Sequence, residues 1–233
     1  MDESMLNFQQ KGEKMKNFLT KIKKCPIFWG IEDNDIEKML TCMGAKVMTL
    51  DKKYTVFTEG SPAKYIGVVL SGEVQVVRND YWGNRSIVEN DGEGQTFCEA
   101  FACAGERSLP VSVVASVPSE VMLLNSDHIL HTCSNNCAFH RQLIFNLMQS
   151  LAHKNIGYHQ RIEVTSKRTT REKIMAYLTL TAKKENSNVF TIPFDRQELA
   201  DYLEVERSGL SAELSKLVSD GIIKTQKSKF EIL

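Results

Sequence analysis

The sequence lacks the features that would assign it at once to a membrane, an export route or a strongly charged partner. Acidic and basic residues balance at 29 each, so no global field of one sign attracts a polyanion or a polycation. Residues 1–24 are polar and rich in lysine, without the apolar core of a signal peptide, and no apolar run is long enough to cross a bilayer. We therefore expect a cytoplasmic protein whose binding surfaces depend on local charge.

A close-paired framework of cysteines is also missing. The six cysteines are scattered, which predicts free thiols in a reducing compartment rather than a disulfide framework. One segment, "HTCSNNCAFH", gathers possible ligands for zinc or iron at His131, Cys133, Cys137 and His140. We interpret these as buried thiols and surface histidines and assign no metal. Cys98 and Cys103 could form a thiol switch if both are exposed.

Signatures of catalysis are absent as well. The chain has no G-x-S-x-G, H-E-x-x-H, Walker loop or dinucleotide fingerprint, so we do not expect an enzyme.

The texture of the chain changes several times along its length. After a polar leader (1–24), short runs rich in Val, Ile and Thr alternate with glycine-containing turns, which is typical of a β-sandwich or β-roll. A helical pattern follows these β-type runs, and after it comes a compact module of basic and apolar residues. We therefore expect a β-roll over 25–135, a long helix over 136–165 and a winged helix-turn-helix over 166–233.

The long helix carries an apolar seam that alternates steps of four and three. The seam comprises Ile144, Met148, Leu151, Asn155, Tyr158 and Ile162. So narrow a heptad stripe favours pairing with a second helix, and therefore a homodimer, while a polar Asn155 would fix the register of the pair. The alternative is one buried helix of a monomer.

The C-terminal module predicts a helix-turn-helix. Asp195 followed by Glu198 is a capping-box pattern, so a helix should begin at Arg196. A turn over 204–206 leads to a second helix. The buried positions of the two helices should be Leu199, Ala200, Leu203, Leu210, Leu214 and Leu217. In this motif the second helix enters the major groove of DNA.

The outward residues of this motif are the candidate DNA contacts. Arg207, at the start of the second helix, is placed to contact guanine, and Ser208 and Ser211 can contact bases or phosphates. Arg196 and Gln197 are placed to hold backbone phosphates. The closing wing adds Lys224, Lys227 and Lys229. The alternative is a helical hairpin for protein contacts, to which the acidic residues Glu204, Glu206 and Glu213 give some support.

The order of roll, long helix and winged helix resembles the cyclic AMP receptor protein / fumarate-nitrate reduction regulator (Crp/Fnr) family of bacterial transcription factors. "RQELADYLEVERSGLSAELSKLVSDGII" is similar to the DNA-reading segment of that family, and "VFTEGSPAKYIGVVLSGEVQVV" to the start of its cyclic-nucleotide-binding roll. The resemblance implies an α+β fold with a jelly-roll effector domain. It also implies a homodimer on a pseudo-palindromic operator, a small effector in the roll, and contact with RNA polymerase.

The same resemblance places an effector site in "GQTFCEAFACAGERSLP". The residues assigned to it are Phe97, Cys98, Glu99, Arg107 and Ser108. In cyclic-nucleotide-binding relatives a Glu accepts from the ribose hydroxyl and an Arg neutralises the phosphate. Here Cys98 stands where the family has glycine, the Glu-to-Arg spacing is shorter, and Pro110 removes an amide donor. These departures favour another small effector, or a simple Glu99–Arg107 ion pair, over a cyclic nucleotide.

Two functions remain open at this point. The first is a sequence-specific transcription regulator that responds to an effector. The second is a nucleotide-binding regulatory module that controls another protein by direct contact.

Overall fold

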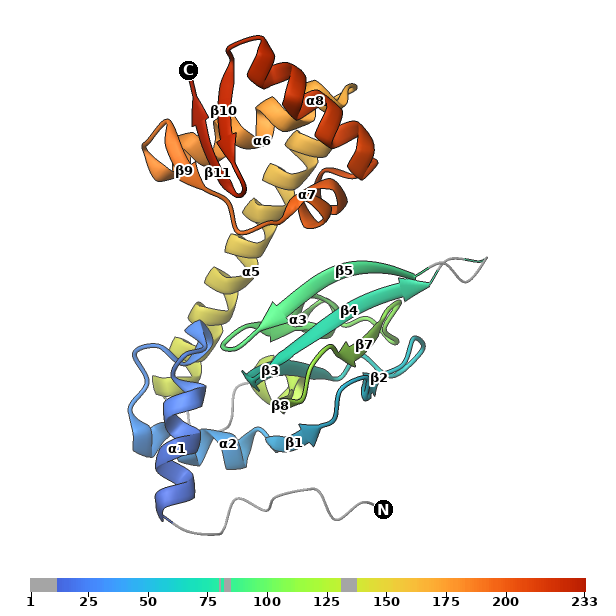
Figure 1. The fold of residues 1–233 in the computed structure, drawn as a ribbon. Helices are drawn as coiled ribbons and strands as arrows, with labels where there is room; N and C mark the ends of the chain where they lie inside the picture. Colours follow the sequence, from blue (N-terminus) through green and yellow to red (C-terminus); the bar gives the residue numbers. More distant parts are fainter. Residues whose placement is uncertain (1–11, 80, 82–84, 131–137) are drawn as a thin grey trace. The chain divides into compact units, whose positions relative to one another are not determined.

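A computed structural model describes residues 12–79, 81, 85–130 and 138–233 of the chain (Figure 1). The chain divides into two compact units, Met1–Ala152 and His153–Leu233. The division falls within helix α5 (Ala138–Thr165), which contributes residues to both units. In the described part of the chain, no helix is both long enough and apolar enough to cross a membrane.

The first unit is an antiparallel β-sandwich with helices before the first strand, after the last strand and between β6 and β7. One sheet has the strand order β1-β8-β3-β6 and the other β2-β7-β4-β5. The strands are β1 (Lys46–Leu50), β2 (Thr55–Phe57), β3 (Tyr65–Ser71), β4 (Glu73–Asn79), β5 (Arg85–Gly92), β6 (Thr96–Phe97), β7 (Ser112–Ala115) and β8 (Ser119–Asn125). The helices are α1 (Gly12–Ile22), η1 (Pro26–Phe28), α2 (Asp33–Cys42), α3 (Glu99–Cys103), α4 (Ser126–Leu130) and the first part of α5.

Strand β3 lies in the middle of this unit, and both of its faces are therefore buried. Ile66, Val68 and Leu70 join the cluster that packs under the helices, whereas Val69 faces the second sheet. Successive side chains of a strand point to opposite faces, so a near-continuous apolar run is required at a position covered on both sides. The layers are therefore helices, first sheet and second sheet.

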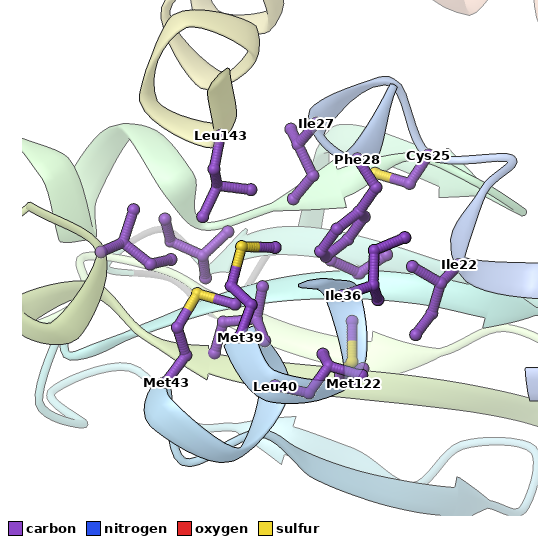
Figure 2. Packing of buried hydrophobic residues seen from close by; sticks show 14 of the residues in the cluster. Ile22, Cys25, Ile27, Phe28, Ile36, Met39, Leu40, Met43, Met122 and Leu143 are labelled. Atoms are coloured by element: carbon purple, nitrogen blue, oxygen red, sulfur yellow. The ribbon is translucent and has the colours of Figure 1, made fainter. Parts of the chain in front are cut away.

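The helix-covered core joins segments from both ends of the first unit. Figure 2 shows Ile22 at the end of α1, Phe28 of η1 and Met39 of α2 gathered with Leu143 of α5. Asn146 of α5 adds two hydrogen bonds, donating through Nδ2 to the carbonyl oxygens of Ile27 (3.0 Å) and Trp29 (2.7 Å). These contacts and hydrogen bonds hold helix α5 against α1 and the segment that follows it.

The turn between β3 and β4 requires glycine. Gly72 has φ +81°, and a Cβ there would lie 2.4 Å from Ser119 Oγ and 2.6 Å from the carbonyl oxygen of Pro118. Only glycine adopts this conformation without strain and leaves room for the neighbouring chain.

The second unit is a winged helix. After the end of α5 it contains α6 (Thr170–Glu185), β9 (Val189–Thr191), α7 (Arg196–Leu203), α8 (Arg207–Ser219), β10 (Ile223–Gln226) and β11 (Lys229–Ile232). The three strands form one sheet in the order β10-β11-β9. The six buried positions expected of the helix-turn-helix are all buried in one core, together with Ile174 and Leu178 of α6. The predicted fold, a β-roll, a long helix and a winged helix-turn-helix, is confirmed.

Candidate nucleic-acid interface and effector site

The predicted capping box starts helix α7. The Asp195 side chain accepts from the backbone N–H of Glu198 (2.8 Å), and Glu198 Oε2 accepts from the backbone N–H of Asp195 (2.7 Å). The reciprocal bonds satisfy two amide groups that a helix start otherwise leaves without partners. They set the first turn of α7, and therefore the direction in which its outward residues point.

The turn between α7 and α8 is held by a lysine from outside the motif. Glu204 ends α7 in the left-handed conformation, with φ +54°, which is uncommon for a residue with a side chain. Lys173 of α6 donates through Nζ to the carbonyl oxygens of Leu203 (3.1 Å) and Glu204 (3.3 Å). A cation at the C-terminal end of a helix also complements its dipole. Lys173 could not be identified from the sequence, because nothing in the motif points to a partner 30 residues earlier.

Helix α8 presents a polar face to solvent. Arg207, Ser208 and Ser211 are exposed, and the opposite face is buried through Leu210 and Leu214. No ion pair within the described residues engages Arg207, so its guanidinium is available to a ligand. Exposed serines leave room for a second surface to approach closely. The helix has the shape and the polar groups needed to enter a major groove.

The two predicted phosphate-binding residues at the start of α7 have different surroundings. Gln197 is exposed and donates through Nε2 to Asp201 Oδ1 (2.8 Å). Arg196 is half-buried: its Nη2 donates to Thr225 Oγ1 (3.0 Å), and its guanidinium lies 5.2 Å from the ring centroid of Phe230. This burial lowers the pKa of Arg196 from its ordinary value, although a guanidinium remains charged in proteins.

The wing is the hairpin of β10 and β11. Gln226 pairs with Lys229, so the loop between the strands is Lys227–Ser228. Lys227 and Lys229 are exposed near this tip. Lys224 is exposed too but pairs with Glu231 on the opposite strand at 3.5 Å. The positive charge of the wing is therefore concentrated at its tip.

The predicted effector residues lie in contrasting environments. Cys98 is buried with φ +61°, a conformation that glycine adopts more easily, and Glu99 begins α3 with its side chain only 2% exposed. Arg107 and Ser108 are exposed in the loop that follows α3. The carboxylate of Glu99 and the guanidinium of Arg107 therefore lie in different environments, one buried and the other exposed to solvent.

Aromatic rings line the interior of the roll. The Phe97 ring is buried directly over Gly67, where a Cβ would lie 2.0 Å from ring atom Cζ. Its centroid is 6.4 Å from that of Phe57, and Phe57 stacks on Tyr65 at the same centroid distance. Phe57 and Tyr65 could not be identified from the sequence, because strand alternation does not indicate which inward-facing rings meet.

The cysteines and histidines show no metal centre in the part of the chain that is described. Three of the four possible ligands, His131, Cys133 and Cys137, lie outside the described residues. His140 is buried, and its Nε2 is 3.3 Å from the carbonyl oxygen of His128. Within the described ranges, no group of three or more His, Cys, Asp or Glu side chains is arranged to hold a metal ion.

The two cysteines near α3 are poorly suited to a thiol switch. Cys98 is buried. Burial, assisted by the negative charge of Glu99, raises the pKa of the Cys103 thiol to about 11. Because the thiolate is the reactive form, both thiols should react slowly at neutral pH.

A capped helix-turn-helix with an exposed polar second helix and a basic wing, preceded by a β-roll, defines a DNA-binding transcription regulator with a ligand-binding type of domain. Two family models match the chain: a cyclic nucleotide-binding domain over residues 47–136 and a Crp-like helix-turn-helix domain over residues 172–233. Together they span more than half of it. The chain belongs to the Crp/Fnr family of transcription regulators, as its sequence motifs indicated.

Solved structures of low identity share the fold. FixK2 from Bradyrhizobium japonicum matches with a TM-score of 0.53 at 18% identity, over 81% of this chain and 92% of that one. The c-di-GMP-responsive global regulator CLP from Xanthomonas campestris matches with a TM-score of 0.60 at 16% identity, over 86% and 99%. A cyclic nucleotide-binding domain from Methylobacillus flagellatus matches with a TM-score of 0.55 at 19% identity, over 68% and 88%. No curated protein was found to match.

Proposed function

We propose that the protein acts in the cytoplasm as a homodimer on a pseudo-palindromic operator, with one α8 in the major groove of each half-site. The observation that carries this proposal is the exposed N-terminal part of α8, where Arg207, Ser208 and Ser211 stand on one face. Arg207 reads a guanine, and the two serines contact bases or phosphates. Gln197 and the lysines of the wing tip hold the DNA backbone.

An apolar stripe on α5 supports the dimer. Phe145, Met148 and Ile162 are 49%, 58% and 61% exposed in the single chain, although each side chain is apolar. A stripe of this kind on a long helix is expected where a second helix covers it.

The exposures favour a seam turned slightly from the one that the sequence pattern indicates. Ile144 and Leu151 pack partly against the core of their own roll, whereas Phe145 and Ala152 are exposed. We therefore propose that the helices pair through the seam Phe145, Met148, Ala152, Asn155, His159 and Ile162, which keeps the same steps of three and four. Met148, Asn155 and Ile162 are common to both registers.

The roll is proposed to bind a small effector that is not a cyclic nucleotide. The pair that would hold a ribose and a cyclic phosphate is divided between buried Glu99 and exposed Arg107. The half-buried rings of Phe57 and Tyr65 instead offer an apolar wall to a planar group. Binding there would change the pairing of α5, and DNA-bound dimers would act on transcription through contact with RNA polymerase.

DNA recognition is tested by selecting operators from random duplexes with the full chain and then measuring affinity by fluorescence anisotropy. Arg207→Ala should cost about 1–3 kcal/mol and relax the preference at one base pair in each half-site. Arg171→Ala is a matched control, because it removes the same charge near Asp220, at the other end of α8. If no sequence is enriched, the wild-type protein is not an operator-binding regulator, and control of another protein by direct contact becomes the better hypothesis.

The effector is tested by thermal melting with cyclic AMP, with cyclic GMP and AMP as controls. A ligand at about 100 times its dissociation constant adds about 2.7 kcal/mol to the stability of the folded state. We expect no shift specific to cyclic AMP. A specific shift that Glu99→Gln abolishes would contradict this part of the proposal.

A further inference from the structure

An arginine at the first position of α7 is unusual in electrostatic terms. The N-terminal end of a helix carries partial positive charge, so a cation there is disfavoured unless another contact compensates. Arg196 occupies this position and is half-buried rather than extended into solvent. Its role should therefore be sought in what its guanidinium touches.

The guanidinium of Arg196 touches both strands of the wing. Nη2 donates to Thr225 Oγ1 of β10 at 3.0 Å, and the guanidinium carbon Cζ lies over the ring of Phe230 of β11, 5.2 Å from its centroid. Such a contact of an arginine with an aromatic ring strengthens as water is excluded from it. One side chain of α7 thus connects the helix-turn-helix to the whole hairpin.

The connection continues to the wing tip. Thr225 Oγ1 lies 3.5 Å from the carbonyl oxygen of Lys227, to which it can donate. Lys227 has φ +54°, a conformation that an L-residue keeps only when its surroundings hold it. The other tip residue, Ser228, donates through Oγ to the carbonyl oxygen of Phe194 (3.2 Å) and accepts at its own carbonyl oxygen from the N–H of Ile192 (2.9 Å). The tip is therefore bonded to the segment that leads into α7.

We propose that Arg196 is a positioning residue for DNA binding: it holds the wing hairpin against the start of α7, so that Lys227 at the tip reaches a backbone phosphate while α8 lies in the major groove. This inference rests on the proposed operator binding. It differs from the sequence-based expectation that Arg196 itself holds a phosphate. The difference is chemical, because the wing contact uses the planar guanidinium, whereas a phosphate contact needs only a positive charge.

Two variants of the full chain separate these roles. Arg196→Lys retains the charge but loses the geometry of the guanidinium, and Thr225→Val removes an uncharged partner that adds no charge toward DNA. The slope of log Kobs against log salt reports how many phosphates the protein neutralises. We expect each variant to weaken operator binding about three- to tenfold and to reduce that slope by about one per half-site, because Lys227 no longer reaches its phosphate. Thr191 is an exposed residue of β9 in the same sheet, so Thr191→Val is the matched control and should change neither the affinity nor the slope.

A third variant tests whether the effect passes through the tip. In a Lys227→Ala background, Arg196→Lys and Thr225→Val should cause no further loss of affinity or slope. The inference is overturned if Arg196→Lys binds like the wild type while Arg196→Ala loses about one unit of slope per half-site, which would indicate a direct phosphate contact. It is also overturned if Lys227→Ala has no effect on binding. If no operator is selected for the wild-type chain, the proposed function itself is refuted. The wild-type measurement comes before any comparison of variants, so this failure is distinguished from a failure of the inference.

Discussion

Truncation of Phe145 tests the dimer and its register together. Phe145 is 49% exposed in the single chain, and the proposed seam covers it with the second helix. A phenylalanine that is fully buried removes about 150–250 Å² from water, so the exposed half represents about 75–125 Å². At about 25 cal/mol per Å², complete cover is worth about 2–3 kcal/mol for each ring.

The expected effect on association follows from this area. Two rings would contribute about 4–6 kcal/mol if the second helix covered both completely, and about half of that if it covered half of the remaining surface. We therefore expect Phe145→Ala to raise the dimer dissociation constant by at least about 30-fold, since each 1.4 kcal/mol is a factor of ten. Sedimentation equilibrium over a concentration series measures this constant directly.

Two further variants make the result decisive. Tyr54→Ala removes an aromatic ring of similar exposure, 45%, that lies outside α5, and it should leave the dimer unchanged. Ile144→Ala should lower the free energy of unfolding of the roll, because Ile144 packs partly against its core, but should weaken the dimer less than Phe145→Ala. If Ile144→Ala dissociates the dimer and Phe145→Ala does not, the shifted register is wrong. A wild-type chain that is monomeric at all concentrations would refute the dimer itself.

Other outcomes follow from single contacts. Asn155→Leu should strengthen the dimer but weaken its preference for two chains, because a polar seam residue fixes the register at a cost in stability. Multi-angle light scattering would detect the larger assemblies. A weakened dimer would argue against a seam position for Asn155. Asp195→Ala should lower the free energy of unfolding by about 1 kcal/mol, because it removes the cap of α7. Urea denaturation measures this change. A change near zero would mean that the capping box is not formed in solution. Cys103 should be alkylated about 100-fold more slowly at pH 7.5 than a thiol with the ordinary pKa of 9.0, because burial raises the pKa of Cys103 to about 11 and leaves far less thiolate. Its rate should rise with pH until about that value. Fast labelling at neutral pH, read by mass spectrometry, would contradict the assigned burial.

The helix-turn-helix could be derived from the sequence because its determinants are local. Asp195 and Glu198 lie three residues apart, and the bonds between them start α7 whatever the rest of the chain does. The leucines of α8 recur with the helical period, which separates its buried face from the face of Arg207. The glycine-containing turns that the sequence indicates include the one at Gly72, where the turn requires a positive φ.

The orientation of α5 could not be derived in the same way. Two heptad registers share Met148, Asn155 and Ile162. They differ at the other three positions, where one has Ile144, Leu151 and Tyr158 and the other has Phe145, Ala152 and His159. Ile144 and Phe145 are both apolar, so periodicity does not separate them. The roll decides, because its core covers one side of the helix at Leu143 and partly at Ile144, and leaves Phe145 exposed.

What the sequence determined by itself was the family, the order of the elements and the face of α8, because these depend on caps, turns and periodic patterns within a few residues. What only the tertiary structure decided was which partners distant residues meet. Arg196 meets Thr225 across 29 residues, Lys173 holds a turn 30 residues later, and Glu99 is buried while Arg107 is exposed. Such contacts form when packing brings separate segments together. The free energy of that packing is distributed over a whole core, so no single motif of the sequence indicates it.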